Sequence, residues 1–180
     1  MLQITIPARE MWDEKNEEFI SFSGQTIQLE HSLVSLSKWE SKYCKPFLSQ
    51  NNKTEEEITD YVRCMTLTQN VNPICYSLLS AKNIDDIQKY INAPMTATIF
   101  SNDASNKAEN EIVTAEVIYY WMTVFNIPFE CQKWHLNRLL TLIKVCDRRS
   151  RPPKKMSKRE ILARNVALNK ARRAKLGSKG

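Results

Sequence analysis

The first thirty residues alternate between apolar and polar side chains, and this pattern predicts β-strands. Residues 2–6 carry an apolar side chain at every second position and are followed by Pro7, which ends the run. Residues 19–23 and 25–29 alternate in the same way on the two sides of Gly24. A period of two indicates strands, and glycine is a typical turn residue between paired strands. We therefore expect a short strand over 2–6 and a β-hairpin that turns at Gly24.

After residue 32 the spacing of apolar residues becomes helical, and it stays so through most of the remaining chain. The first four predicted helices each begin at a residue that can accept hydrogen bonds from free backbone amides, and two of them end before a proline. The first helix is capped by Ser32 and ended by Pro46, and the second begins at the capping box of Thr54 and Glu57. The third is a short helix from Asn72-Pro73 through Leu79, and the fourth begins at Asn83 and ends before Pro94. Residues 101–110 are polar and without period, which is typical of a loop.

The two most hydrophobic helices are predicted over 112–125 and 129–146. Only residues 126–128 separate them, and such a tight connection favours an antiparallel helical hairpin. We expect this hairpin at the centre of the core. The predicted fold class is mainly α with a small β component (α+β): a helical body, a small N-terminal β-hairpin sheet and a basic C-terminal helix.

The charge is divided unevenly along the 180 residues. Residues 1–146 hold 13 Lys and Arg against 18 Asp and Glu, a net of −5, whereas residues 147–180 hold 13 against 2, a net of +11. We therefore divide the chain into an acidic, mostly helical body at 1–146 with its strands within 2–29, a basic proline-containing linker at 147–156, and a basic helix at 157–180.

The C-terminal helix is predicted from the capping box of Ser157 and Glu160 to about Leu176, just before Gly177. Its apolar residues are few and lie among alanines, asparagines and seven basic residues. Such a thin apolar stripe cannot form a core alone, so we expect this helix to need a partner surface.

Several classes of chemistry lack their sequence signals. Three glycines cannot build a dinucleotide-binding or phosphate-binding loop, both of which need several glycines close together. The five cysteines have no metal-knuckle spacing, and His31 and His135 belong to no catalytic or metal-binding motif. We interpret both histidines as satisfied or interfacial residues. We expect a protein with no enzymatic activity, no cofactor, no metal and no membrane span, with its thiols reduced in a cytoplasmic compartment.

Tryptophan and arginine dominate many protein interfaces, which selects candidates for partner contacts. Trp39 is either a core residue or a contact, and Trp134 is a second candidate. The adjacent aromatic residues Tyr119, Tyr120 and Trp121 point in different directions on a helix, so we interpret them as core packing rather than a platform for stacking bases. The candidate basic residues for partner binding are Arg148, Arg149, Arg151, Lys154, Lys155, Arg159, Arg164, Arg172 and Arg173.

Seven strings of this sequence resemble a family of small proteins encoded by long-tailed bacteriophages. They are LEHSLVSLSKWESK (29–42), PFL (46–48), APMTAT (93–98), IYYWM (118–122), NIPFEC (126–131), WHLNRLLTLI (134–143) and MSKREI (156–161), and they extend over nearly the whole chain. The resemblance implies a tail assembly chaperone, a non-enzymatic protein that holds the tape measure protein and helps tail tube subunits assemble around it. It also implies a place in the host cytoplasm, absence from the finished particle, and in some members a longer form made by ribosomal frameshifting.

A second interpretation of the basic segment stays open. A net charge of +11 can bind polyanions, so residues 148–175 could form the phosphate-contacting arm of a nucleic-acid-binding or structural virion protein. The same charge could also dock on an acidic protein surface, including the body of a second copy.

Overall fold

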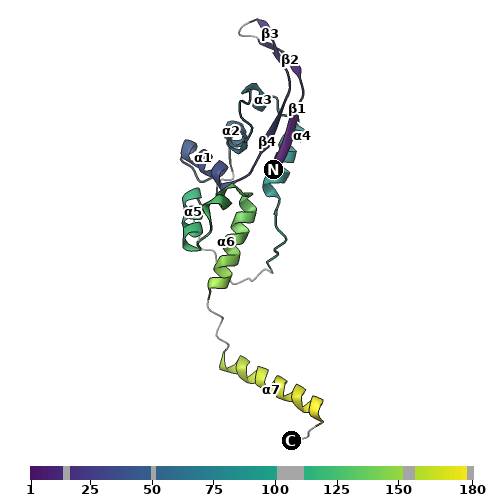
Figure 1. Ribbon diagram of the computed structural model, residues 1–180, viewed down its shortest axis with the longest axis vertical. Coiled ribbons are helices and arrows are strands. Elements are labelled where there is room, and N and C mark those ends of the chain that lie inside the picture. The colour runs from purple at the N-terminus through teal and green to yellow at the C-terminus, as the bar shows by residue number, and fades with distance from the viewer. Residues whose placement is uncertain (14–16, 50–51, 101–111, 152–156, 178–180) are drawn as a thin grey trace. The chain divides into compact units, whose positions relative to one another are not determined.

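The computed structural model describes residues 1–13, 17–49, 52–100, 112–151 and 157–177 (Figure 1). Within them the chain forms four strands, seven α-helices and one 3₁₀ helix. The predicted class, mainly helical α+β, is confirmed. The chain divides into two compact units, residues Met1–Asp147 and Arg148–Gly180.

The N-terminal strands form one long, interrupted β-hairpin rather than the hairpin that the sequence predicts. The strands are β1 (Leu2–Ile6), β2 (Arg9–Asp13), β3 (Glu18–Phe22) and β4 (Gln25–Leu29). β1 pairs with β4, and β2 pairs with β3, both antiparallel. The β2–β3 ladder ends at the pair of Asp13 and Glu18. β3 and β4 follow each other along the same arm of the hairpin. The predicted turn at Gly24 is therefore wrong.

Gly24 is required for a different reason. It lies at the break between β3 and β4, opposite the break at Pro7-Ala8, and has a φ of +78°. A Cβ atom there would lie 2.8 Å from the backbone nitrogen of Ala8. Glycine thus allows the two arms of the hairpin to approach closely where the ladder is interrupted.

Most of the predicted N-cap residues are observed at the start of a helix. They are α1 (Leu33–Tyr43), α2 (Glu55–Met65), α3 (Ile74–Ser77), α4 (Ala81–Asn92), α5 (Ala115–Val124), the 3₁₀ helix η1 (Phe129–Lys133), α6 (Leu136–Ser150) and α7 (Lys158–Leu176). The side chain of Ser32 caps α1, and the predicted capping boxes are present at Thr54 and Ser157. α4 begins three residues earlier than predicted, because Ser80 and not Asn83 is its N-cap.

The predicted helix over 129–146 is divided into two elements. Trp134 adopts an extended conformation with ψ of 162°, which separates η1 from α6. His135 forms an isolated antiparallel bridge with Ser32, and the amide of Leu136 donates to the carbonyl of His31 at 2.7 Å. This contact between distant parts of the chain takes the place of helical hydrogen bonds. α6 then continues to Ser150, so the first residues of the expected linker are helical.

Two apolar clusters form the core of the first unit, and α1 contributes to both. Trp39 belongs to the cluster built with β1, β4, α2 and α4. Leu33 and Leu36 belong to the other cluster, together with buried residues of α5, η1 and α6. The two hydrophobic C-terminal helices of this unit therefore meet around α1. No helix among the described residues has the length and apolar character needed to cross a membrane.

Candidate functional site

The structure brings together the two histidines, which lie far apart in the sequence. Both are buried, and their ring centroids are 5.2 Å apart in an edge-to-face arrangement. His31 lies between β4 and α1, and His135 lies between η1 and α6. The backbone bridge between Ser32 and His135 positions the pair. No sequence motif predicts that the two histidines are close together, because only the tertiary contact creates this proximity.

Each histidine has a hydrogen-bond partner. Nδ1 of His31 and the hydroxyl of Tyr61 share a hydrogen bond of 2.6 Å. Nε2 of His135 donates to the carbonyl of Tyr90 at 3.0 Å, and its Nδ1 accepts from the amide of Asn137 at 3.3 Å. Donation at one ring nitrogen and acceptance at the other fit a neutral imidazole. The sequence-based interpretation of satisfied histidines is thus supported by these contacts.

Burial keeps this pair uncharged. Burial, and secondarily the nearby His135, lower the pKa of His31 to about 3. Burial also lowers the pKa of His135, although its hydrogen bond to the Tyr90 carbonyl opposes the change. Two neutral rings enclosed by Tyr61 and Tyr90 join β4, α1, α2, α4 and α6 at one point. The arrangement is suited to holding these elements together.

The buried carboxylates of Glu40 and Glu57 accept hydrogen bonds from backbone amides. Glu40 accepts from the amide of Phe47 at 2.8 Å and from the amide of Ala115, the first residue of α5, at 2.7 Å. Glu57 completes the capping box of α2 and pairs with Lys45 at 2.7 Å. The hydrogen bond from Lys45, followed by that from Thr54, lowers the pKa of the Glu57 carboxyl.

Asp60 is the centre of a small charged network. It accepts hydrogen bonds from Lys42, from Tyr43 at 2.6 Å and from Arg63 at 2.8 Å. The hydrogen bonds from Lys42 and Tyr43 lower the pKa of the Asp60 carboxyl. Across the described ranges, no three His, Cys, Asp or Glu side chains gather so that they could hold a metal ion.

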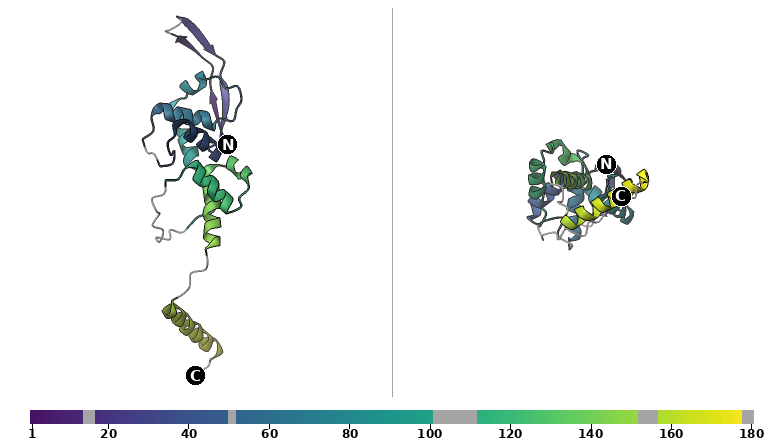
Figure 2. Two further views of the ribbon diagram at one scale, coloured as in Figure 1. Left: turned by 90° about the vertical axis from the view of Figure 1, so that its left-hand side faces the viewer. Right: turned by 90° about the horizontal axis from the view of Figure 1, so that it is seen from below.

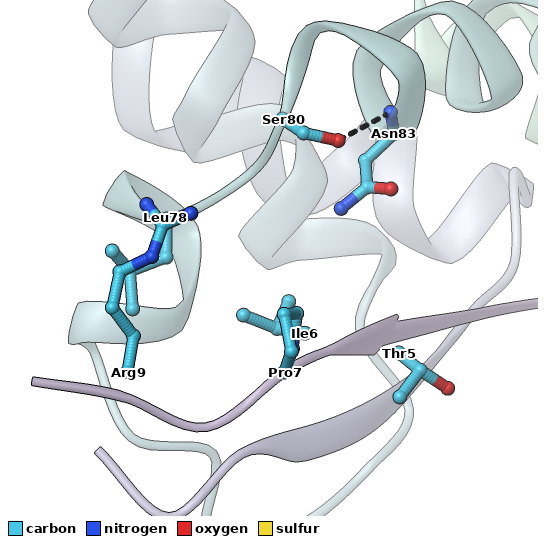
Figure 3. Close-up of a pocket in the computed structure, with 7 residues that line it drawn as sticks. All are labelled: Thr5, Ile6, Pro7, Arg9, Leu78, Ser80 and Asn83. Atoms are coloured by element: carbon cyan, nitrogen blue, oxygen red, sulfur yellow. Dashed lines mark hydrogen bonds between the residues drawn. The ribbon is translucent and has the colours of Figure 1, made fainter.

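A small cavity of about 150 Å³ lies beside the break between β1 and β2 (Figure 3). Its lining comes from β1, Pro7 and β2 on one side, and from the segment before α4 and the first turn of α4 on the other. The lining residues are Thr5, Ile6, Pro7, Arg9, Leu78, Ser80 and Asn83. Ser80, on this lining, is occupied as the cap of α4, since its hydroxyl accepts from the amide of Asn83 at 3.2 Å. Arg9 is the one ionisable side chain among the lining residues, so the cavity presents no pair of acid and base.

The two predicted partner-binding tryptophans differ in burial. Trp39 is 0% exposed, and its indole donates to the carbonyl of Glu57 at 2.9 Å. It is a core residue, so its selection as a contact is corrected: the apolar spacing of α1 turns the indole inward. Trp134 is half-buried, with the guanidinium of Arg138 4.1 Å above its ring.

The predicted basic residues that the structure describes are all exposed. Arg148 and Arg149 lie in the last turn of α6, and Arg151 follows it. Lys154 and Lys155 lie outside the described residues. The remaining predicted contacts, Arg159, Arg164, Arg172 and Arg173, are on α7, a helix in which no residue is buried.

Sequence reasoning missed one exposed aromatic pair. Trp12 of β2 and Phe19 of β3 are directly opposite in the ladder, with ring centroids 4.9 Å apart and planes at 65°. Their exposed fractions are 52% and 72%. Residues 9–13 show no alternation of apolar and polar side chains, because Met11 and Trp12 are adjacent, so the pair is visible only when the pairing of β2 with β3 is known.

No family model matches this chain, and comparisons with curated proteins and with solved structures found no match.

Proposed function

We propose that this chain is a non-enzymatic assembly factor of a long-tailed bacteriophage, a tail assembly chaperone that binds the tape measure protein, the tail tube protein or both. The family comes from the resemblance of the sequence strings. The observation that carries the binding role is α7, a helix of 19 residues with none of them buried.

α7 has the local signals of a helix and lacks a core of its own. A capping box begins it, and Gly177 ends it in the left-handed conformation. Four aliphatic side chains, Ile161, Leu162, Val166 and Leu168, are 44–68% exposed. Helices in water gain most of their stability from packing, so these side chains favour a protein partner that covers them.

The proposal is tested by co-expression with the tape measure protein of the phage that encodes this chain. We expect the wild-type chain to keep that partner soluble and to copurify with it. Replacing these four aliphatic residues by Gln keeps the charge and helix propensity of α7, and should remove copurification. The control is the double variant I58Q/I84Q, which changes two exposed isoleucines in helices of the first unit. A partner that is equally insoluble with and without this chain would refute the chaperone role.

A nucleic-acid-binding arm is the second candidate, favoured by the charge of α7. The segment Lys158–Leu176 holds seven basic residues and one acid, a net of +6. Replacing Lys170, Arg172 and Arg173 by Gln should then abolish a gel shift that weakens steeply with salt, whereas the aliphatic variant should retain it. Absence of any shift at about 50 mM salt, where phosphate contacts are strongest, counts against this candidate.

A further inference from the structure

The β2–β3 hairpin presents an exposed face that the core does not use. Successive side chains of a strand point to opposite faces, and directly opposite residues share a face. Glu10 and Ser21 form one such pair, and Trp12 and Phe19 form the next. One face of the hairpin therefore carries two exposed aromatic rings beside a carboxylate, while Phe22 lies on the other face and is buried.

This hairpin is also acidic. Its described residues, 9–13 and 17–22, hold one basic residue and four acids, a net of −3. Exposed aromatic side chains on a sheet edge are costly in a protein that remains alone in water. Their faces attract cations, and arginine most often. The chain itself contains such a contact, between Arg138 and the ring of Trp134.

α7 is complementary to this face in both charge and polarity. It has a net charge of +6 and carries exposed aliphatic side chains among its basic residues. An acidic aromatic hairpin and a basic aliphatic helix could each cover the apolar groups of the other while bringing opposite charges together.

We propose that the Trp12–Phe19 face of one copy binds α7 of a second copy, so that the chain associates head to tail. β2 and β3 lie together at one end of the first unit, away from the helices of that unit (Figures 1 and 2). A contact between this face and α7 of the same chain would leave a monomer, whereas a contact with a second copy gives association, so the association state in solution separates the two. The inference does not rest on the tail-chaperone proposal.

The two surfaces that meet are different, so this contact is heterologous and can be tested by complementation. The hairpin variant is W12S/F19S, and the helix variant is K170E/R172E/R173E, both in the full chain. By sedimentation velocity, after nuclease treatment, we expect the wild type to associate at about 50 mM salt and to dissociate at about 500 mM, because salt screens exposed charges. Each variant alone should be monomeric. An equal mixture should form dimers, because each variant keeps the surface that the other lacks.

Controls separate this contact from folding defects and from nucleic acid. Glu10→Lys leaves the aromatic pair and the ladder in place, and should weaken association by about tenfold if one favourable charge contact is replaced by a repulsive one. The variants K133E/K144E and I58S/I84S change exposed residues elsewhere and should associate like the wild type.

Three results would each overturn the proposal. They are a wild-type chain that stays monomeric at low salt, a hairpin or helix variant that still associates alone, and a mixture of the two that does not form dimers. Association that disappears on nuclease treatment of the wild type would assign α7 to nucleic acid instead.

Discussion

Glu40 shows how a single buried side chain can join parts of this chain that are far apart in sequence. Its two carboxylate oxygens accept from the amides of Phe47 and Ala115, so it holds the segment after α1 against the first turn of α5. α5 has no cap from its own N-cap residue, Thr114. The carboxylate of a neighbouring helix therefore supplies the acceptor that a local cap provides elsewhere.

We expect Glu40→Gln to lower the free energy of unfolding by about 1–3 kcal/mol, because an amide group cannot accept at both positions and one buried donor is left unsatisfied. Urea unfolding followed by circular dichroism measures this loss. The matched control is Glu116→Gln, an exposed residue in the same first turn of α5, which should change the value by less than about 0.5 kcal/mol. Equal effects of both substitutions would contradict the role given to Glu40.

The histidine pair predicts how stability depends on pH. The folded pKa of His31, about 3, lies below its value of 6.5 in an unfolded chain, so the unfolded state binds more protons between these values. Stability is therefore complete above pH 6.5 and is lost as the pH falls toward 3. The lowered pKa of His135 acts in the same direction.

From pH 7.5 to 5.5 we expect the free energy of unfolding to fall by at least about 1.4 kcal/mol, the value for one pKa unit at one site. This range lies above the titration of ordinary carboxylates, which isolates the histidines. In the variant His31→Gln, the same change of pH should cost measurably less than in the wild type. A wild-type stability that is constant over this range would show that the pair is not buried and neutral.

At the scale of elements, the N-terminal hairpin depends on one close approach. The backbone of Gly24 faces Ala8 at the break in the ladder, and the residue has a positive φ. Gly177 at the end of α7 also has a positive φ, but an added Cβ would meet nothing within 4 Å. The two glycines thus share a backbone conformation and differ in their surroundings.

Gly24→Ala should lower the free energy of unfolding of the first unit by roughly 1–3 kcal/mol, since strain at φ is combined with a contact to backbone atoms. Gly177→Ala should leave the unfolding of that unit unchanged and affect only the end of α7. Thermal denaturation of both variants, monitored by near-ultraviolet circular dichroism, compares them. If the two variants lowered the midpoint equally, the close approach at Gly24 would have no energetic role.

On the scale of the whole molecule, the two units differ in how they are stabilised. Both apolar clusters consist of residues within Met1–Asp147, whereas α7 buries no residue. The charge follows the same division, with −6 on residues 1–147 and +12 on residues 148–180. The first unit has the core that a folded domain requires, whereas α7 is a helix without a core of its own.

At about 500 mM salt, where the proposed association is screened, deleting residues 157–180 should leave the stability of the first unit within about 0.5 kcal/mol of the full chain, because no core contact is lost. The midpoint of thermal unfolding should then shift by about 1–2 °C at most. Differential scanning calorimetry provides this comparison, and circular dichroism should show a loss of helical signal in proportion to α7. A large drop in the midpoint would mean that α7 packs on the body.

The sequence by itself determined the local structure of this protein: helix starts at Ser32, Thr54 and Ser157, the helical body, and the separation of charge. Helix caps and apolar periodicity depend on residues close together in the sequence, so they can be recognised from the sequence alone. The tertiary structure decided the pairing of β2 with β3, the burial of Trp39 and the meeting of His31 with His135. These features depend on hydrogen bonds and packing between distant segments, whose free energy is gained only when the whole chain folds. The exposed aromatic face that we assign to a second copy also exists only because the ladder places Trp12 opposite Phe19.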